Sequence, residues 1–450
     1  GIDELGPAVT TTDNNSYSHN YGVESYLARI NYGFKSRYYI DASWRTDGSS
    51  RFHPSDRWGH FWSVGASWRI SEEQFMENTR QWLDNLTLKV SYGVQGNDNL
   101  GTYYAWQGLY DYTWPNATDA GAFVDKLENR KVTWEKNGNL NAGIEATMFG
   151  GRLGVSVEYY NRKTRDMLLN SPLPISTGFT GFNDNVGSLR NQGLEVSLRG
   201  TILDKRDFRW DATLMGSFNR NKVLSLTGGQ DVITSGIRVI EVGRPIYTFY
   251  LPKTAGVDPA TGKQLYYAYW TQTVNDEGTL VNTRCDEYIT DNVAMATLSK
   301  YYHESREPKL FGSIGSTFTI LKNIDVSFLT TYSIGGWVYD GLYNGSMYVQ
   351  YAGNNWHKNA KRRWQKPGDK TDVPMLEVGG SYATASNSLI DASYFAIKNI
   401  TVGYTLPKRW LKKIDIESLR IYATLDNIAM FNHMDGMDPQ YNFTGSVAYS

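Results

Sequence analysis

The stretch NLTLKVSYGVQG, residues 85–96, alternates strictly between apolar and polar or very small side chains. Its apolar members are Leu86, Leu88, Val90, Tyr92 and Val94. A period of two places alternate side chains on opposite faces of a β-strand, so this stretch predicts a strand with one apolar and one polar face. The apolar face must be covered either by a protein core or by lipid.

The same pattern recurs along the whole chain. Three perfect ten-residue alternations begin at Trp62, Leu86 and Asn139. Further runs with few defects begin near Ala28, Ile40, Leu153, Leu194, Phe208, Leu310, Ile324, Tyr394 and Leu419. Together these runs predict twelve strands of about 8–11 residues, the length that a tilted strand needs to cross a bilayer.

Composition narrows the class of protein. The 450 residues have a mean hydropathy of −0.47 although 14% of them are aromatic, and no apolar run approaches the length of a membrane-spanning helix. The formal net charge of −1 gives no indication of a nucleic-acid partner. Cys285 is the single cysteine, which excludes an internal disulfide.

The predicted connections alternate between short and long. Tight turns are expected at residues 35–37, 150–152, 204–207 and 321–323, and long connections at 46–61, 97–138, 162–192, 220–309 and 336–393. Two larger connections on the short side, 71–85 and 407–418, have room for a helical turn or two. Bacterial outer-membrane barrels separate periplasmic turns from extracellular loops in this way.

Aromatic residues gather near both ends of the predicted strands. Beside the tight turns are Tyr32, Phe34, Phe208, Trp210 and Phe318, and near the long connections are Trp44, Trp62, Phe218 and Tyr332. Membrane–water interfaces select two such belts. We therefore predict an all-β, transmembrane antiparallel β-barrel; a soluble β-sandwich is the alternative.

Strand parity predicts that residues 1–450 form the C-terminal part of one larger barrel domain. The first predicted strand runs toward the tight-turn end and the last runs away from it, whereas a closed barrel needs an even strand count with both ends on the periplasmic side. Open strand edges are not tolerated in lipid, so we expect further strands on both sides. A twelve-stranded barrel made by this chain alone is the alternative.

Several collinear segments resemble the SusC/RagA family of TonB-dependent outer-membrane transporters. They are RTDGSSRFHPSDRWGHFWSVGASWRISEEQFM (45–76), LKVSYGVQGND (88–98), YYNRKTRDMLL (159–169), STGF (176–179), NQGLEVSL (191–198), RRWQKPGDKTDVP (362–374), ASYFAIKNITVGYTLPKRWL (392–411) and LRIYATLDNIAMFNHMDGMDPQ (419–440). The resemblance implies that the chain supplies roughly strands 10 to 21 of about 22. The plug, the TonB box, the first strands and the last strand are then expected to be absent.

The resemblance also implies a function and its partners. It implies an importer in the bacterial outer membrane that takes up oligosaccharides or oligopeptides, with a SusD-like surface lipoprotein as lid and the TonB complex supplying work through the missing N-terminal region. Membrane lipid is the remaining expected partner, and no cofactor is expected. Alternatives are a passive porin without a plug, a barrel-type outer-membrane enzyme such as a lipase, and a soluble adhesin.

Aromatic residues in the long connections are the substrate-binding candidates, because aromatic rings stack on apolar ligand faces such as those of sugars. They are Tyr103, Tyr104, Trp106, Trp114, Tyr266, Trp270, Trp337, Tyr343 and Trp356. Loop–loop packing and contact with the lid protein are the alternative roles for these rings.

Two motifs are expected to be structural. In DGSSRF, Asp47 and Gly48 are predicted to form a turn that Ser49 and Ser50 cap, with Arg51 paired inside the lumen. The basic run 361–363 is expected to be solvated or paired with Asp369 and Asp372, although it is also suited to an acidic substrate or a lipopolysaccharide phosphate.

The sequence contains no catalytic motif that would favour an enzyme. The histidines, at positions 18, 53, 60, 303, 357 and 433, show no zinc-like spacing, and neither a G-x-S-x-G elbow nor a P-loop is present. We expect neither catalytic nor metal-binding residues.

Overall fold

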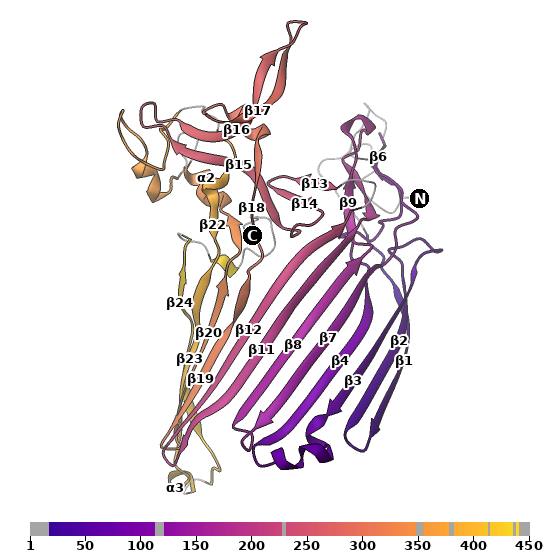
Figure 1. Ribbon diagram of the computed structural model, residues 1–450, viewed down its shortest axis with the longest axis vertical. Helices are drawn as coiled ribbons and strands as arrows, with labels where there is room; N and C mark the ends of the chain where they lie inside the picture. Colours follow the sequence, from indigo (N-terminus) through magenta and orange to yellow (C-terminus); the bar gives the residue numbers. More distant parts are fainter. Residues whose placement is uncertain are drawn as a thin grey trace. The chain divides into compact units, whose positions relative to one another are not determined.

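The computed structural model describes residues 18–112, 121–226, 231–347, 353, 355–377, 382–412, 415–434 and 438–440. Twelve long strands form one antiparallel sheet in chain order (Figure 1). They are β1 (Val23–Phe34), β2 (Tyr38–Ser49), β3 (Trp58–Arg69), β4 (Leu83–Asn97), β7 (Glu135–Met148), β8 (Leu153–Arg165), β11 (Ser188–Lys205), β12 (Phe208–Ser225), β19 (Leu310–Ile320), β20 (Ile324–Ile334), β23 (Tyr394–Thr405) and β24 (Arg420–Asn432). The twelve predicted strands are confirmed.

The chain divides into two compact units. The first comprises Gly1–Thr201, Asn219–Ile233 and Glu241–Gly243, and the second comprises Ile202–Phe218, Thr234–Ile240 and Arg244–Ser450. The first contains strands β1 to β10, β11 as far as Thr201, the end of β12 from Asn219, and the candidate site described below. The second contains strands β19 to β24 and the larger folded connections.

Register in the first unit pairs apolar residues with apolar residues. Val90 of β4 lies opposite Ala66 of β3 and Ala142 of β7, whereas its neighbour Ser91 lies opposite Gly65 and Asn141. Because side chains alternate across a strand, the sheet therefore has one continuous apolar face and one polar face. Val90 is 43% exposed although it is apolar, as expected for a face that meets lipid.

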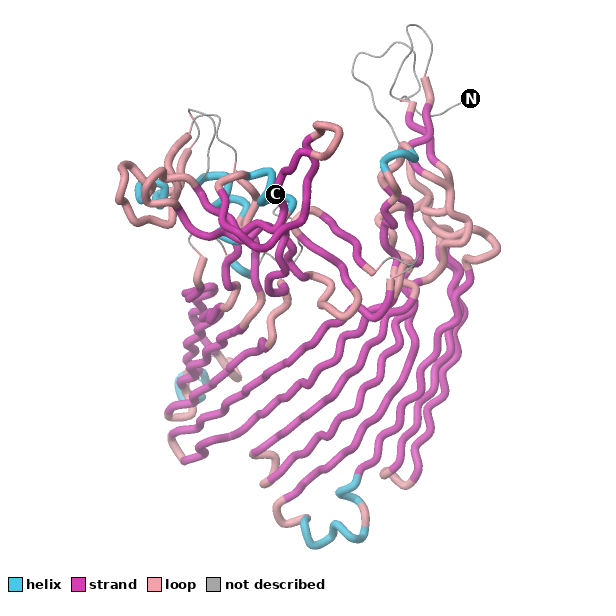
Figure 2. The backbone as a smooth tube through the Cα atoms, turned by 45° about the horizontal axis from the view of Figure 1, so that its top comes forward, coloured by secondary structure: helices cyan, strands magenta, loops and turns pink. Residues whose placement is uncertain are grey.

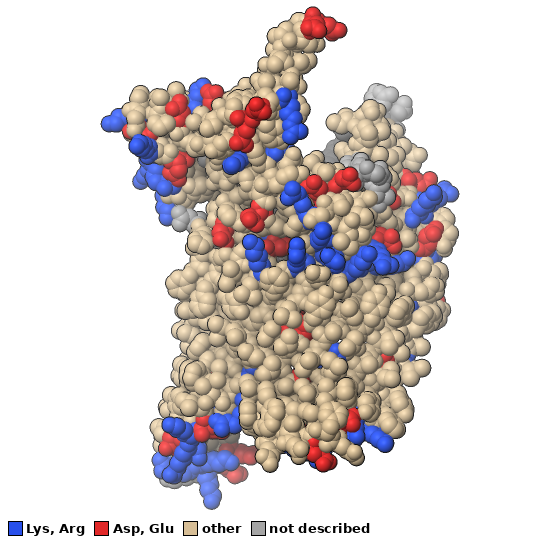
Figure 3. Space-filling model, viewed as in Figure 1, with Lys and Arg blue, Asp and Glu red and all other residues tan. Residues whose placement is uncertain are grey.

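Charged side chains gather at both ends of the strands (Figure 3). Over the middle of strands β4, β7 and β8 the visible face carries few of them. Exposed aromatic residues lie toward both borders of this face, among them Tyr32 and Phe34 beside the tight turn and Trp44 and Trp62 at the other end. This arrangement fits the predicted pair of aromatic belts.

The tight turns lie where they were predicted. Lys35 and Ser36 both have positive φ values of 50° and 54°, and Leu321 and Lys322 have 51° and 62°. Two consecutive left-handed residues are the geometry of a type I′ hairpin turn, whose twist matches that of the flanking strands. The two larger connections on this side contain short helical segments, as expected: 3₁₀ turns at Ile70–Glu72 and Gln74–Thr79, and α3 (Lys408–Leu411) (Figure 2).

Most strands are longer than predicted and reach 18 residues in β11 and β12, whereas β19 and β20, with 11 residues each, lie within the predicted range. Much of the expected connection 46–61 is strand, because β2 continues to Ser49 and β3 begins at Trp58. Hydrogen bonds between the backbones of neighbouring strands continue beyond the point where side chains stop alternating. The alternation therefore predicted only the part of each strand that has one apolar face. Asp47 and Gly48 accordingly lie within β2, and their predicted turn is wrong.

The long connections contain strands of their own, which alternation did not predict. In the first unit these include β5 (Leu109–Asp111), β6 (Phe123–Lys126), β9 (Leu168–Pro172) and β10 (Gly181–Asn185). Between β12 and β19 lie β13 (Val232–Ser235), β14 (Arg238–Glu241), β15 (Thr248–Val257), β16 (Gln264–Val274), β17 (Leu280–Thr290), α1 (Val293–Leu298) and β18 (Lys300–Ser305). Between β20 and β23 lie β21 (Trp337–Tyr339), α2 (Gly341–Met347), β22 (Leu389–Asp391) and 3₁₀ turns at Lys358–Arg362 and Ser386–Ser388; a further 3₁₀ turn is Ile175–Thr177.

Strands β16 and β17 form a hairpin that projects from this loop fold (Figure 1). Val274 and Leu280, which flank its turn, are 65% and 63% exposed. Among the described residues, every helix is too short or too polar to cross a membrane.

Candidate functional site

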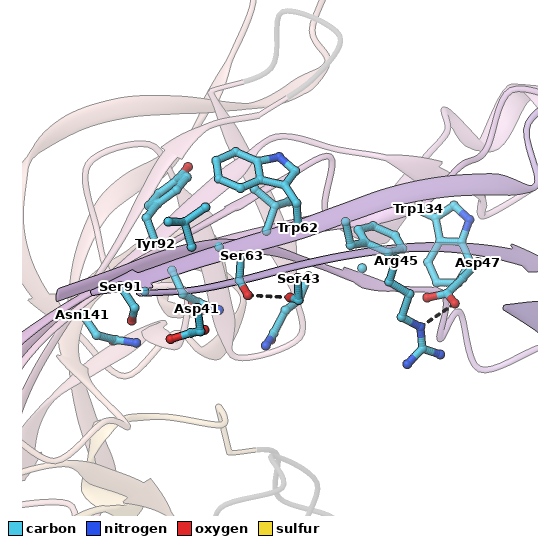
Figure 4. Close-up of a pocket in the computed structure, with 18 of the residues that line it drawn as sticks. Asp41, Ser43, Arg45, Asp47, Trp62, Ser63, Ser91, Tyr92, Trp134 and Asn141 are labelled. Atoms are coloured by element: carbon cyan, nitrogen blue, oxygen red, sulfur yellow. Dashed lines mark hydrogen bonds and ion pairs between the residues drawn. The ribbon is translucent and has the colours of Figure 1, made fainter. Parts of the chain in front are cut away.

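The polar face of strands β2, β3, β4 and β7 borders a hollow of about 860 Å³ (Figure 4). Asp41, Ser43 and Ser91 extend from one side of these strands, and Trp62 and Tyr92 extend from the other side. The polar lining comprises Asp41, Ser43, Arg45, Asp47, Ser63, Ser91, Gln95, Asp98, Asn139 and Asn141. Strict alternation produces this wall, since the polar positions of all four strands fall on the same face.

The wall presents both hydrogen-bond donors and acceptors. Arg45 donates from Nε to Asp47 Oδ1 at 2.6 Å, and the side chain of Arg45 is 54% exposed. The hydroxyl oxygens of Ser43 and Ser63 lie 2.7 Å apart. Such a surface suits a polar, hydrated ligand whose hydroxyl or amide groups exchange water for these partners.

Buried aromatic residues cluster near one end of the hollow. The ring centroids of Phe52 and Phe61 lie 5.4 and 5.3 Å from that of Trp134, and Phe61 and Trp134 also line the hollow. Phe61 occupies a position on the polar face, and a Cβ at Gly96 would lie 2.1 Å from its ring. Gly96 is therefore required for the ring to lie across β4.

A group of contacts that we term the loop clasp joins three segments at the long-connection end of the first unit. It consists of Tyr21, Ser49, Arg51, Asp98 and Tyr103. Asp98 accepts hydrogen bonds from Ser49 Oγ at 2.7 Å, Tyr21 Oη at 2.9 Å and Arg51 Nη1 at 3.2 Å. The Arg51 guanidinium also lies 4.6 Å from the Tyr21 ring centroid and 5.1 Å from that of Tyr103.

The loop clasp gives a structural role to two residues of the DGSSRF motif, Ser49 and Arg51. Arg51 and Asp98 are only 14% and 16% exposed, so the ion pair is largely shielded from water. Burial and the hydrogen bond to Asp98 raise the pKa of Tyr21, which therefore stays a neutral donor. Arg51 is paired, as predicted, and Ser49 accepts from the Arg51 amide at 3.3 Å.

The predicted aromatic residues of the first unit take part in loop packing. Tyr103 belongs to the loop clasp, and Tyr104 Oη accepts a hydrogen bond from the Asn20 amide at 2.9 Å. Trp106 packs against the cluster of Phe52 and Trp134 and lies edge-on to His53. Trp114 lies outside the described residues.

In the second unit, Tyr266 is a buried packing residue. It is 1% exposed, its hydroxyl accepts from the Ala383 amide at 3.1 Å, and burial raises its pKa to about 12. Its ring is therefore enclosed by protein in this structure. Trp270, in β16, is partly exposed, and its carbonyl accepts from Tyr288 Oη.

The remaining candidates of the second unit are also partly buried. Trp337 lines a cavity of about 140 Å³. Tyr343 lies edge-on to His357 at 4.9 Å, and the Arg363 guanidinium lies 5.8 Å from the Trp356 ring centroid. Tyr343 and Trp356 pack against one cluster of buried residues, Met347, Ala360 and Val373, whereas Trp337 is not part of that cluster.

The basic run 361–363 is paired in part. Arg362 forms an ion pair with Asp372 at 3.2 Å, as expected. Within the described ranges, no group of three or more His, Cys, Asp or Glu residues is arranged to hold a metal ion.

Comparison with known proteins identifies the family. The model of the TonB dependent receptor-like β-barrel family matches residues 2–428. The chain belongs to this family. It is therefore part of a β-barrel of the bacterial outer membrane, and its tight turns correspond to the periplasmic side and its long connections to the extracellular side.

Individual relatives agree with the family assignment. TonB-dependent receptor P39 of Formosa agariphila is 29% identical, over 98% of this chain and 45% of the relative. TonB-dependent receptor SusC of Bacteroides thetaiotaomicron is 28% identical, over 94% of this chain and 42% of the relative. A solved structure of the RagAB peptide transporter superposes with a TM-score of 0.80 at 30% identity, over 96% of this chain and 47% of that chain. The chain thus spans less than half the length of these relatives, and it resembles SusC/RagA-type transporters, as predicted.

Sequence analysis missed the polar wall as a site, although its pattern was visible. The sequence analysis interpreted the polar residues at alternate positions of Ile40–Arg45 and of residues 85–96 only as the solvent-facing side of a strand. Phe61 is the signal that was overlooked: it is an aromatic residue directly before the alternation that begins at Trp62, at a position that shares the polar face.

Proposed function

We propose that this chain forms the barrel wall and extracellular connections of a TonB-dependent nutrient importer. The cargo is an oligosaccharide or an oligopeptide, and a SusD-like lipoprotein covers the extracellular side. The observation that carries the proposal is the continuous polar wall of β2, β3, β4 and β7, with its hollow of about 860 Å³, backed by an apolar face.

The similar proteins support this choice of function. The RagAB structure is that of a peptide transporter, and SusC and P39 are TonB-dependent receptors. A wall that carries carboxylates, hydroxyls, amides and Arg45 can form hydrogen bonds with sugar hydroxyls or peptide amides. The role is transport, with no chemical conversion of the cargo.

Energised uptake by the full-length protein in cells tests the proposal. We expect accumulation of labelled oligosaccharide or oligopeptide that is lost when TonB is deleted or when the proton gradient is collapsed. A steady open-pore current from reconstituted full-length protein, together with TonB-independent uptake, would instead indicate a passive porin and contradict the proposal.

Variants of the polar wall test the site itself. Ser63→Leu combined with Ser91→Leu places two apolar side chains in the hollow and removes two hydroxyls. We expect uptake to fall at least about tenfold, because each lost hydrogen bond to cargo contributes about 1 kcal/mol and the added volume narrows the hollow. Ala66→Leu with Val90→Leu, on the other face of the same strands and outside the lining of the hollow, is the matched control and should leave uptake unchanged.

Substrate contact by the aromatic residues of the connections remains a prediction. Its members are Tyr103, Tyr104, Trp106, Trp114, Tyr266, Trp270, Trp337, Tyr343 and Trp356. Replacing Trp270 with alanine tests one of them, because this partly exposed ring is not enclosed like that of Tyr266.

A further inference from the structure

A basic patch lies on the apolar, outward face of the sheet at its extracellular end. It consists of Lys136 of β7, Lys163 and Arg165 of β8, Arg190 of β11, and Arg220 and Lys222 of β12. Their face follows from alternation, since Lys163 and Arg165 continue the row of Val155, Val157 and Tyr159. Basic side chains gather on the visible face above the uncharged band of these strands (Figure 3).

Register brings like charges directly opposite one another within this patch. Lys163 is paired with Arg190, and Lys136 is paired with Arg165. Directly opposed side chains lie about 5 Å apart at Cβ, and like charges at this spacing repel. Two such pairs on neighbouring strands destabilise the sheet unless an anion compensates them.

The protein supplies little of that compensation. Lys136 approaches Asp166 at 3.8 Å, and both side chains are about half exposed. Among the described residues, the side chains of Lys163, Arg165, Arg190, Arg220 and Lys222 have neither a hydrogen bond nor an ion pair. The patch therefore presents unneutralised positive charge to whatever surrounds the barrel.

The position of the patch identifies those surroundings. Lys163 lies ten residues along β8 from Leu153, which corresponds to about 34 Å of strand and to about 26 Å across the membrane at a tilt of about 40°. The apolar band of such barrels is about 25 Å tall. The outward-facing pairs of β8 and β11 become more polar toward the extracellular end. They change from Val157–Val196 and Tyr159–Leu194 to Asn161–Gln192 and then to Lys163–Arg190. The charges thus begin at the level of the lipid headgroups.

We propose that this basic patch binds the phosphate groups of a phosphorylated glycolipid in the outer leaflet of the outer membrane. The acyl chains of the lipid lie against the apolar row, including Tyr159 and Leu194, and its phosphates lie between Lys163, Arg190 and Arg165. Guanidinium and ammonium groups together suit a phosphate, which accepts several charge-assisted hydrogen bonds. The proposal does not depend on the cargo or on the transport mechanism.

Binding of purified lipid A to the full-length protein in detergent tests this proposal. Each Lys or Arg near an anionic lipid surface contributes about 1 kcal/mol, so Lys163→Gln with Arg190→Gln should weaken binding of bisphosphorylated lipid A roughly 30-fold. The matched control is Arg162→Gln with Arg199→Gln, which removes the same charge from the same two strands on the opposite face. This control should bind as the unmodified protein does.

Two further probes distinguish a lipid phosphate from other ligands. Dephosphorylated lipid A should bind at least tenfold more weakly than the bisphosphorylated form, and inorganic phosphate alone should not compete at the same concentration. Equal binding of both lipids would show that acyl chains suffice, and competition by free phosphate would show a site for soluble anions; either result overturns the proposal.

Folding of the variant is controlled independently. Removing the like-charge pair should leave thermal stability in lipid-free detergent unchanged or slightly higher, because the repulsion is relieved. Lys163→Arg with Arg190→Lys keeps both charges and should retain lipid binding. Loss of binding in this charge-preserving variant would refute the proposal, as would full binding by the charge-removing one.

Discussion

Replacing Asp98 with asparagine removes the charge at the centre of the loop clasp and keeps the shape of the side chain. Asp98 accepts hydrogen bonds from Ser49, Tyr21 and Arg51. In its ion pair with Arg51, each of the two side chains is about 85% shielded from solvent. Truncating one partner of a buried ion pair costs about 3–5 kcal/mol. Because asparagine retains one acceptor oxygen, we expect a loss of about 2–3 kcal/mol in the free energy of local opening.

Hydrogen exchange of the backbone amides joined by the loop clasp measures this loss. The Gly22 amide donates to Ser50 Oγ and the Ser50 amide donates to the Gly22 carbonyl, each at 3.0 Å. Their exchange in the full-length protein should accelerate on the order of 100-fold, as the expected free-energy change requires. Amides in the middle of β4 should keep their rates.

An exposed ion pair in the same unit provides the control. Glu128 pairs with Arg130, and their side chains are 45% and 65% exposed. Glu128→Gln should change nearby exchange less than about threefold, since exposed pairs contribute at most about 0.5 kcal/mol here. If Asp98→Asn had no larger effect than Glu128→Gln, the loop clasp would not hold these segments together.

Three further predictions concern other parts of the chain. Val90→Arg should destabilise the barrel in lipid bilayers by about 2–4 kcal/mol, whereas Ser91→Arg on the polar face should have less than half that effect; the midpoint of urea unfolding measures both, and equal effects would refute the assigned faces. Burial raises the pKa of Glu307 to about 7 from its usual value near 4.5, so the folded state favours the protonated carboxyl group. The stability of the folded state is therefore highest, as far as Glu307 is concerned, below about pH 4.5, and this share is lost as pH rises through about 7. Glu307→Gln should therefore reduce the fall in melting temperature between pH 4.5 and 7, and an unchanged pH profile would contradict this assignment. Tyr266→Phe leaves the buried Ala383 amide without its acceptor, and exchange of that amide should rise about 10- to 100-fold; an unchanged rate would show that another acceptor replaces the hydroxyl.

The membrane-crossing part of the fold could be predicted from the sequence because the bilayer imposes a simple rule. Each crossing strand must present apolar side chains at alternate positions, and Leu86 to Val94 follow this rule without a defect. The extracellular part follows no such rule. The last residues of β2, from Thr46 to Ser49, are buried by protein on both faces, so they continue the ladder without alternating between apolar and polar side chains.

The candidate site was harder to predict because aromatic residues serve packing and binding equally well. Tyr266 and Trp270 are separated by four positions in β16, yet Tyr266 is enclosed and Trp270 is partly exposed. That difference depends on contacts with Ala296 and Ala383, which are distant in sequence. Arg51 was predicted to be paired, but its partner Asp98 could not be named because it belongs to another connection.

The projecting β16–β17 hairpin offers a practical route to detecting this protein on intact cells. Its turn, from Asn275 to Gly278, closes through a hydrogen bond of the Gly278 amide to the Asn275 carbonyl, and Gly278 has a φ of 76°. Exposed loop tips tolerate insertions well because few backbone contacts are lost. A short peptide epitope placed between Asp276 and Glu277 should therefore fold normally and be labelled by antibody without permeabilising the cells.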